Sequence, residues 1–183
     1  MATTQAPATS STWKIDPSHS NVEFAVKHLM ISTVKGHFAD VEGEIVIANG
    51  DPSRSSVSAT LKAASIDTRT GQRDDHLRSA DFLDAANFPE ITFKSTRIAG
   101  DDSEFKVIGN LTIRGVTREI TLEATNEGSG KDPWGGERIG FSAKTKLDRR
   151  DFGLTWNQAI ESGGVVVGHE LKVSIEIEAV KQG

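Results

Sequence analysis

Residues 73–93, RDDHLRSADFLDAANFPEITF, hold the densest group of side chains that could do chemistry. Asp74, Asp75 and His76 are residue types that occur in metal sites and in acid/base pairs. Three consecutive residues on a helical turn point in different directions, so these three do not converge on one ion without further ligands. An acid/base role would need a partner in a cleft and a shifted pKa, and the sequence alone shows neither.

A lid accounts for more of the residues in this segment. The two aspartates suit the first turn of a short helix, because the N-terminus of a helix favours negative charge. Pro89 forces Phe88 into an extended conformation before the next strand begins. Leu77, Ala80, Leu83 and Phe88 would then face inward. We interpret the segment as a hinged cover over an apolar interior.

The other motifs predict no catalytic residue, no metal and no cofactor. His19, His28 and His37 recur at intervals of nine, which match no compact set of metal ligands. The run GSGKD at 128–132 lacks the pattern of a phosphate-binding loop. A GxSxG nucleophile motif is absent from the sequence.

The segment LDRRDFGLTWN at 147–157 places arginines beside apolar residues. Arg149 and Arg150 with Phe152 and Trp156 could receive the anionic head and the tail of an amphiphile. A solvated turn followed by an irregular strand packed in the core explains the same residues. Both interpretations stay open at the level of sequence.

Composition limits the classes of protein that fit. The chain has 183 residues, enough for one domain, and its 21 basic and 26 acidic residues are spread without a basic cluster, which argues against nucleic acid as a partner. The lack of cysteine excludes disulfides and thiol chemistry. No apolar run reaches the roughly eighteen residues of a membrane helix, so stable membrane insertion is not expected.

The first twelve residues, MATTQAPATSST, show neither the basic nor the apolar region of a secretory signal. We expect a disordered N-terminal tail over 1–12, a single domain over 13–183 and a cytoplasmic protein.

The elements that must position these side chains are β-strands. Eight segments alternate apolar and polar residues, as strands with one apolar face do. They are 22–28, 41–47, 56–63, 90–98, 104–113, 118–125, 138–147 and 169–180. Turn residues separate them, which favours antiparallel neighbours. Helix is expected only in short pieces, chiefly 29–34 and about 72–83.

The pattern predicts an all-β fold, an eight-stranded antiparallel barrel with short helical lid segments. Such a barrel is either filled by its own side chains or holds one small ligand. The alternation of apolar and polar residues is the same in both cases. Small residues at positions that can face inward, Ala59, Gly109 and Ala143, favour an unfilled lumen. Small residues also occur where strands bend.

Four segments together resemble the YceI-like family: DPSHSNVEFAVKHLMISTVKGHF (16–38), DDHLRSADFLDAANFPEITF (74–93), GNLTIRGVTREITL (109–122) and RRDFGLTWN (149–157). The match spans residues 13–180. The resemblance implies a lipocalin-like barrel whose lumen binds polyisoprenoids and isoprenoid quinones, and a possible homodimer. It implies no catalytic residues, and many relatives carry a secretory signal that is not seen here.

We therefore predict that the protein sequesters or transports a long-chain isoprenoid lipid or quinone. The alternating pattern and the position of each residue in its strand select candidate contacts with the ligand. The pattern alone does not say which face of a strand lines the lumen. The candidate tail contacts are Phe24, Val26, Phe38, Leu77, Phe82, Phe93, Ile108, Leu111, Ile113, Phe141 and Trp156. The candidate head contacts are His28, Arg73, His76 and Arg149.

Two other functions fit the sequence. One is an enzyme that acts on a lipid-like substrate, with His76 and a neighbouring aspartate as acid and base. The other is a filled barrel without a ligand that serves as a stress factor or interaction module.

Overall fold

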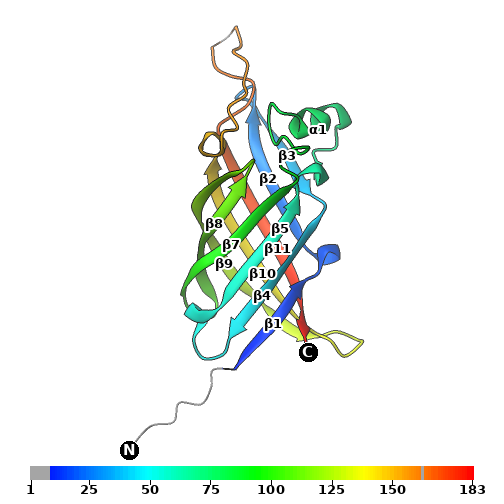
Figure 1. Cartoon of the computed structure of the whole chain (residues 1–183), viewed down its shortest axis with the longest axis vertical. Coiled ribbons are helices and arrows are strands. Elements are labelled where there is room, and N and C mark those ends of the chain that lie inside the picture. Colours follow the sequence, from blue (N-terminus) through cyan, green and yellow to red (C-terminus); the bar gives the residue numbers. More distant parts are fainter. Residues whose placement is uncertain (1–8, 162) are drawn as a thin grey trace, which may run out of the picture.

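The computed structural model describes residues 9–161 and 163–183. Its strands wrap around one long axis, and the helix α1 (Gly71–Arg78) lies at one end (Figure 1). The strands are β1 (Ser10–Ile15), β2 (Asn21–His28), β3 (Ser32–Phe38), β4 (Val41–Ala48), β5 (Ser56–Lys62), β6 (Ile66–Asp67), β7 (Glu90–Gly100), β8 (Glu104–Ile113), β9 (Val116–Lys131), β10 (Glu137–Asp148) and β11 (Glu170–Gln182). Four 3-10 turns are η1 (Pro17–His19), η2 (Pro52–Arg54), η3 (Ala63–Ser65) and η4 (Arg149–Phe152). Within the described residues, no helix has the length and hydropathy that crossing a membrane requires.

The sheet closes on itself through antiparallel pairs. The order β1-β4-β5-β7-β8-β9-β10-β11 returns to β1, because β11 also pairs with β1. This ring of eight strands confirms the predicted eight-stranded antiparallel barrel. Closure satisfies the backbone hydrogen bonds that an open sheet would leave free at its edges.

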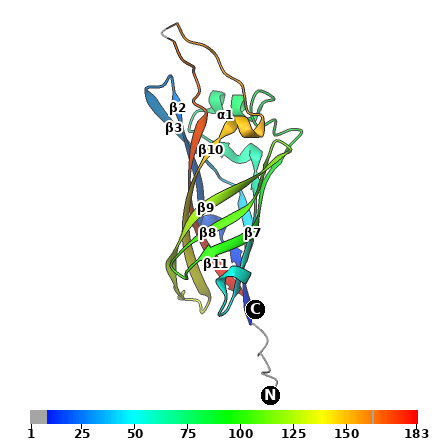
Figure 2. The same cartoon turned by 90° about the vertical axis from the view of Figure 1, so that its left-hand side faces the viewer.

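The remaining segments lengthen the wall toward the helical end. Asp16 and Pro17 interrupt one long strand, since proline cannot donate to a ladder and the Asp16 carboxylate accepts from the backbone N–H of Ser18 at 2.9 Å. β2 continues β1 beyond this break, and β11 pairs with β1 over 179–182 and with β2 over 172–176. β3 leads into β4 in the same way. β2, β3 and β6 therefore extend the wall at the end that carries α1, and Figure 2 shows β2 and β3 beside this helix.

The apolar interior consists of separate clusters. One gathers under α1 and contains Leu83, Phe152 and Leu154 among its buried members. Another lies at the end that carries the termini, around Trp13 and Ala179. A third covers part of the wall between them. Many inward side chains along the wall are only half-buried, because they border empty space rather than one another.

All eight predicted strands are present, and 104–113 matches β8 at both ends. The strands β1, β3 and β6 were not among the predicted strands, and residues 10–12 belong to β1 rather than to the predicted tail. The rest of the tail, 1–8, lies outside the described residues. The predicted helix at 29–34 is wrong, since this segment forms the turn between β2 and β3 and the start of β3.

The prediction of a helix at about 72–83 is confirmed over most of its length, although α1 ends at Arg78 and hydrogen-bonded turns follow. Phe82 and Leu83, on these turns, are buried. Ala80 is exposed rather than inward. The lid is therefore one helix with an irregular continuation whose apolar residues close the barrel.

Gly109 on β8 makes room for an aromatic ring rather than for the lumen. A Cβ atom at Gly109 would lie 2.6 Å from Cζ of Phe93 and 2.5 Å from the carbonyl oxygen of Lys94. β7 carries a bulge between Ser95 and Arg97 beside this position. The ring of Phe93, which lies diagonally across from Gly109 on β7, thus covers the glycine.

We expect Gly109→Val to lower the free energy of unfolding by about 2 kcal/mol, because neither the ring nor the backbone oxygen can move without strain. Thermal and denaturant unfolding measure the effect. Gly130→Val is the matched control, since a Cβ at Gly130 meets nothing within 4 Å. Equal stability of the two variants would contradict this account.

Candidate functional site

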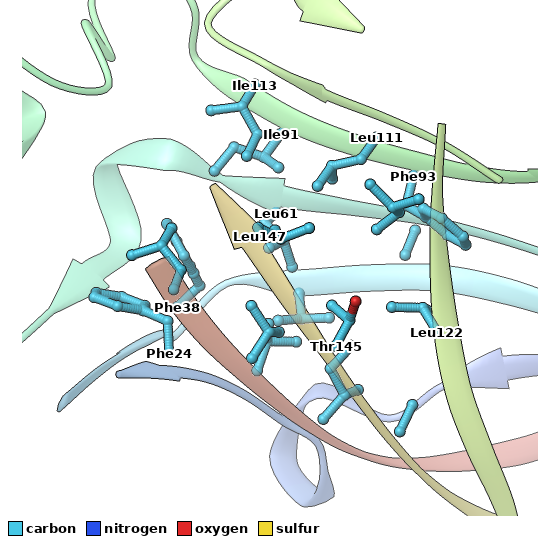
Figure 3. A pocket seen from close by; sticks show the side chains of 18 of the residues that line it. Phe24, Phe38, Leu61, Ile91, Phe93, Leu111, Ile113, Leu122, Thr145 and Leu147 are labelled. Atoms are coloured by element: carbon cyan, nitrogen blue, oxygen red, sulfur yellow. The ribbon is translucent and has the colours of Figure 1, made fainter. Parts of the chain in front are cut away.

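The barrel encloses an apolar cavity of about 300 Å³, a size within the range of ligand pockets. Inward side chains of the wall strands line it along the axis, as Figure 3 shows for Phe24, Phe93, Leu122 and Leu147. The barrel is therefore hollow, and its own side chains do not fill the lumen.

The two ends of the cavity are sealed by different elements. Leu77 from α1, Phe82 and Leu83 from the turns after it, and Leu154 after η4 line the end beneath the helix. Ile15, Ile45 and Phe141 line the opposite end; Ile45 and Phe141 pack on the cluster around Trp13. The lid end is built from short, irregular segments, whereas the other end is built from strands.

The wall carries almost no polar chemistry. Its two charged residues are Glu23 and Arg149. The Glu23 carboxylate lies 3.8 Å from Nζ of Lys35, and both side chains are exposed, so this charge sits outside the barrel. Thr145 offers a hydroxyl to the lumen, but it donates to the carbonyl oxygen of Thr121 at 2.9 Å. The cavity thus suits a molecule that presents hydrocarbon to the wall.

Most residues predicted as tail contacts do border the cavity. They are Phe24, Val26, Phe38, Leu77, Phe82, Phe93, Leu111, Ile113 and Phe141. Ile108 does not, because alternation along β8 places its side chain on the face opposite to Val107, which lines the lumen. Trp156 also lies outside the cavity wall.

Trp156 belongs to an aromatic cluster on the outer side of the lid. The ring of His76 lies 4.7 Å from the ring of Trp156 and 5.1 Å from the ring of Phe82. Nε2 of His76 is 2.8 Å from a carboxylate oxygen of Asp81, and both of these side chains are more than a third exposed. His76 therefore pairs with Asp81 rather than with an adjacent aspartate, and this pair faces solvent rather than the lumen.

Two other predicted head contacts, Arg73 and His28, do not line the cavity. Nε and Nη2 of Arg73 donate to the hydroxyl and the carbonyl oxygen of Thr68, both at 2.8 Å. The buried carboxylate of Asp74 accepts from the backbone N–H of Thr68 at 2.9 Å. These bonds fix the start of α1. His28 lies at the end of β2, where it forms an isolated bridge with Val167, and it does not line the cavity.

Arg149 is the one predicted head contact that lines the cavity. It is 2% exposed, and none of its contacts in the described residues is a carboxylate. Nε donates to the carbonyl oxygen of Gly168 at 2.7 Å, Nη1 to those of Leu154 and Trp156 at 2.6 and 2.9 Å, and Nη2 to that of Val167 at 3.3 Å. Burial lowers the pKa of this guanidinium from its ordinary value. The side chain fastens the loop after η4 to the start of β11.

A further set of wall residues was not predicted from the sequence. They include Leu61, Ile91, Leu122, Leu147, Val173 and Ile175. All six lie in predicted strands with the correct parity, so the alternating pattern carried a signal for them. Only closure of the sheet shows that one face of every strand borders the same space.

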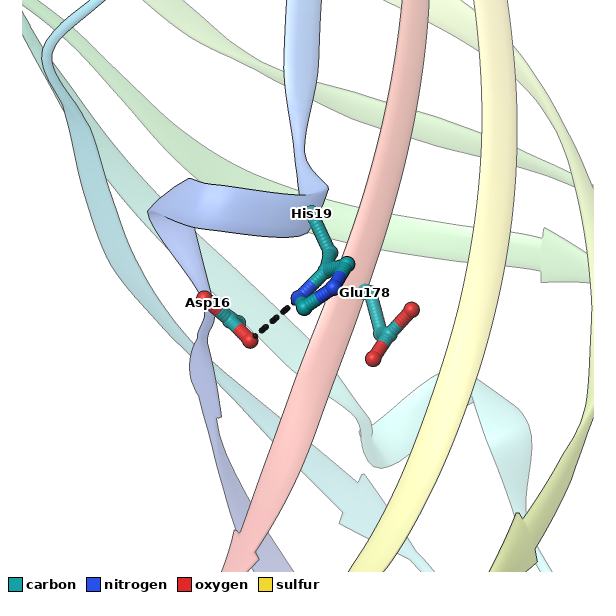
Figure 4. Close-up of side chains that lie close together, drawn as sticks. All are labelled: Asp16, His19 and Glu178. Atoms are coloured by element: carbon teal, nitrogen blue, oxygen red, sulfur yellow. Dashed lines mark hydrogen bonds and ion pairs between the residues drawn. The ribbon is translucent and has the colours of Figure 1, made fainter. Parts of the chain in front are cut away.

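A second group of titratable side chains lies outside the barrel, at η1 (Figure 4). Ligand atoms of Asp16, His19 and Glu178 lie within 4.8 Å of one another. Arg138 donates to both carboxylates, at 2.9 Å for Asp16 and 2.7 Å for Glu178, and its Nε lies 3.0 Å from Asp132. Because the guanidinium already pairs with the carboxylates that a cation would need, we interpret the group as an ion-pair network that joins η1, β10 and β11.

The barrel and its cavity define a class: a single antiparallel β-barrel with an apolar lumen and a lid, as in lipocalin-like proteins. Comparison with known proteins then identifies the family. The model of the YceI-like domain matches residues 13–179. Protein YceI from Salmonella newport is 39% identical over 181 residues, which cover 98% of this chain and 92% of that protein. The chain belongs to the YceI-like family.

Solved structures agree with this assignment. The Campylobacter jejuni YceI protein is 35% identical, with a TM-score of 0.71 over 86% of this chain and 90% of that one. BcnA from Burkholderia cenocepacia gives a TM-score of 0.78 at 21% identity, over 90% and 98% of the two chains. A polyisoprenoid binding domain from Saccharophagus degradans gives 0.65 at 14% identity, over 96% and 99%. The last two show a common fold.

Replacing Arg149 by lysine should lower the free energy of unfolding by about 2 kcal/mol, because lysine keeps the charge but loses the fork that reaches four carbonyl groups. Fluorescence of Trp156 should change as the loop loosens. Arg150→Lys is the control, since Arg150 is half-exposed and pairs with Asp148 on the surface. Similar unfolding curves for the two variants would disprove the fastening role.

The network around Arg138 predicts a dependence of stability on pH. Hydrogen bonds from Ser18, then His19 and Arg138, hold the pKa of Asp16 well below its usual range, and Arg138 lowers the pKa of Asp132. A carboxyl whose pKa is lowered by folding stabilises the protein above its unfolded pKa of about 4, and this contribution is lost as the pH falls through the folded value.

We therefore expect Arg138→Gln to lower the thermal midpoint at pH 7, and the difference from the parent to shrink below about pH 3. Thermal unfolding between pH 2 and pH 7 measures both effects. Lys62→Gln, which removes a pair with Glu90 that is half-exposed, is the control with a smaller change. A difference that stays constant with pH would refute the coupling.

Proposed function

We propose that this protein binds a long-chain apolar lipid, a polyisoprenoid or an isoprenoid quinone, in its lumen and thereby sequesters or transports it. The observation that carries the proposal is the enclosed cavity with its hydrocarbon wall. Each methylene group removed from water contributes about 0.8 kcal/mol before ordering costs, so even a partly buried prenyl tail gives strong binding.

The comparisons support a lipid as the ligand class. The YceI-like family assignment covers nearly the whole domain, and a polyisoprenoid binding domain shares the fold. The quinone, the cytoplasmic location and the homodimer stay predictions, as does the choice between storage and transport.

We place the tail along the wall between the two sealed ends and the head near Arg149. Arg149 lines the cavity, and its guanidinium has five N–H groups, most of which donate to four surrounding carbonyl groups. A buried cation without a carboxylate partner favours an electron-rich or anionic head group. The nine predicted tail contacts that border the cavity are the residues we propose for the tail.

The geometry favours binding over catalysis. The pair formed by His76 and Asp81 lies on the solvent side of Phe82, and the ring of Phe82 separates it from the lumen. A lumen ligand would not reach this pair while the lid is closed. The filled barrel is disfavoured by the cavity itself.

The test fills the lumen without changing the outer surface. Ala143 on β10 lines the cavity, and Lys144 beside it is exposed. Ala143→Phe should abolish retention of added prenyl lipid and remove any lipid that co-purifies, because the new ring occupies the space of the tail. Mass spectrometry of solvent extracts from the purified protein measures both quantities.

Lys144→Phe is the matched control and should retain lipid like the parent. Circular dichroism checks that both variants fold, since a large residue in a cavity can be accepted at a cost of about 1–3 kcal/mol. Failure of the parent to retain any prenyl lipid, or equal retention by folded Ala143→Phe, would overturn the proposal.

A further inference from the structure

The turn between β2 and β3 presents large apolar side chains to solvent. Met30 is 61% exposed and Ile31 is 83% exposed. Leu29 and Met30 have φ angles of 51° and 63°, and the N–H of Ile31 donates to the carbonyl oxygen of His28 at 3.2 Å. Leu29 and Met30 are the central residues of this turn, within a three-residue connection between β2 and β3. Asparagine and glycine usually occupy such positions, because other residues are disfavoured at positive φ. Local stability therefore does not explain the choice of residues at this turn.

The turn is joined to the loop that follows η4. The N–H of Leu29 donates to the carbonyl oxygen of Val166, and the N–H of Gly168 to that of Lys27, both at 2.9 Å. Met30 lies directly against Gly164. We call residues 29–31, 153–161 and 163–168 the rim. The turn and the loop lie at the same end as α1, away from both termini (Figures 1 and 2).

The rim has almost no charge. Glu161 is its only charged residue, whereas 26% of the whole chain is charged. A loop that faces water usually carries more charge than the rest of a domain. Single exposed apolar residues need no explanation, but two neighbours at a disfavoured turn beside a loop with a single charge indicate a contact surface.

Apolar surface continues from the rim into the cavity. Leu154 and Val167 belong to the rim and also line the lumen. Val167 bridges to His28, the residue just before the turn. Whatever covers the rim therefore lies next to the end of the cavity that the lid closes.

We propose that the rim docks on the surface of a lipid bilayer, with Met30 and Ile31 inserted among the lipids. The inference rests on the proposed function, because a prenyl lipid has its source and destination in a lipid phase rather than in water. The net charge of −5 gives no general attraction to anionic lipids, so insertion of apolar side chains must drive the contact. Docking would bring the lid against the membrane and shorten the path of the lipid through water.

The experiment measures binding to phosphatidylcholine vesicles by co-sedimentation, at low and high salt. We expect the parent to bind at both salt concentrations. The double variant Met30→Gly, Ile31→Thr should bind about tenfold more weakly or less, because most of the inserted surface is lost. Its thermal midpoint should stay the same or rise, since glycine relieves the positive φ at residue 30. A loss of binding is then not a loss of folding.

Trp134→Thr is the matched control. Trp134 is 84% exposed between β9 and β10, at the end of the barrel that carries the termini. The Trp134→Thr variant removes a large exposed apolar side chain from a site that the proposal does not use, so its vesicle binding should equal that of the parent.

Retention of a prenyl lipid delivered from detergent is measured in parallel, without vesicles. A parent that retains lipid but does not bind vesicles would overturn the docking proposal and leave the proposed function intact. If the parent binds vesicles through the rim but retains no lipid, the proposed function is overturned and the docking proposal stands. Unchanged vesicle binding by the double variant would also overturn docking. Docking would likewise be overturned if the parent is a dimer and the double variant a monomer, because the rim would then contact a second copy of the chain.

Discussion

The structure depends on a mismatch between the circumference of a closed sheet and the volume of the side chains inside it. Eight wall strands leave no free edge, and every wall strand turns one apolar face toward the same axis. The inward side chains line this axis without filling it. A cavity with a hydrocarbon wall follows, and it cannot collapse without breaking the ladders that close the ring.

Different elements close the two ends of this cavity. At the end with the termini, the strands themselves converge around Trp13, so the seal is part of the hydrogen-bonded wall. At the other end the seal is α1 with the turns that follow and the loop held by Arg149, which rest on side-chain contacts to backbone groups. Contacts of this kind open at lower cost than strand ladders. The asymmetry favours the lid end as the route of a ligand.

The charged groups of the molecule are kept out of the cavity, with one exception. Glu23 pairs with Lys35 outside, His76 pairs with Asp81 on the lid, and Arg138 gathers its carboxylates at η1. Among the residues that the structure describes, only Arg149 brings a charge to the lumen, and there it is held by carbonyl dipoles. An arrangement of this kind suits recognition by shape and apolar contact, with a single polar anchor.

The sequence by itself determined eight of the strands, their antiparallel pairing and part of the lining of the lumen, because the alternation of apolar and polar residues is a local property of each segment. It failed at β1 and at the turn around Met30, where the local pattern was short or conflicted with the backbone that neighbours impose. Tertiary structure alone decided which face is inside, as shown by Ile108 and Val107, which are adjacent in sequence and lie on opposite sides of the wall. It also decided the role of Arg149: the carbonyl groups of Leu154 and Gly168 converge on this side chain only after the loop has folded back on the barrel. Enclosure and convergence depend on distances between segments far apart in the chain, and no local pattern records those distances.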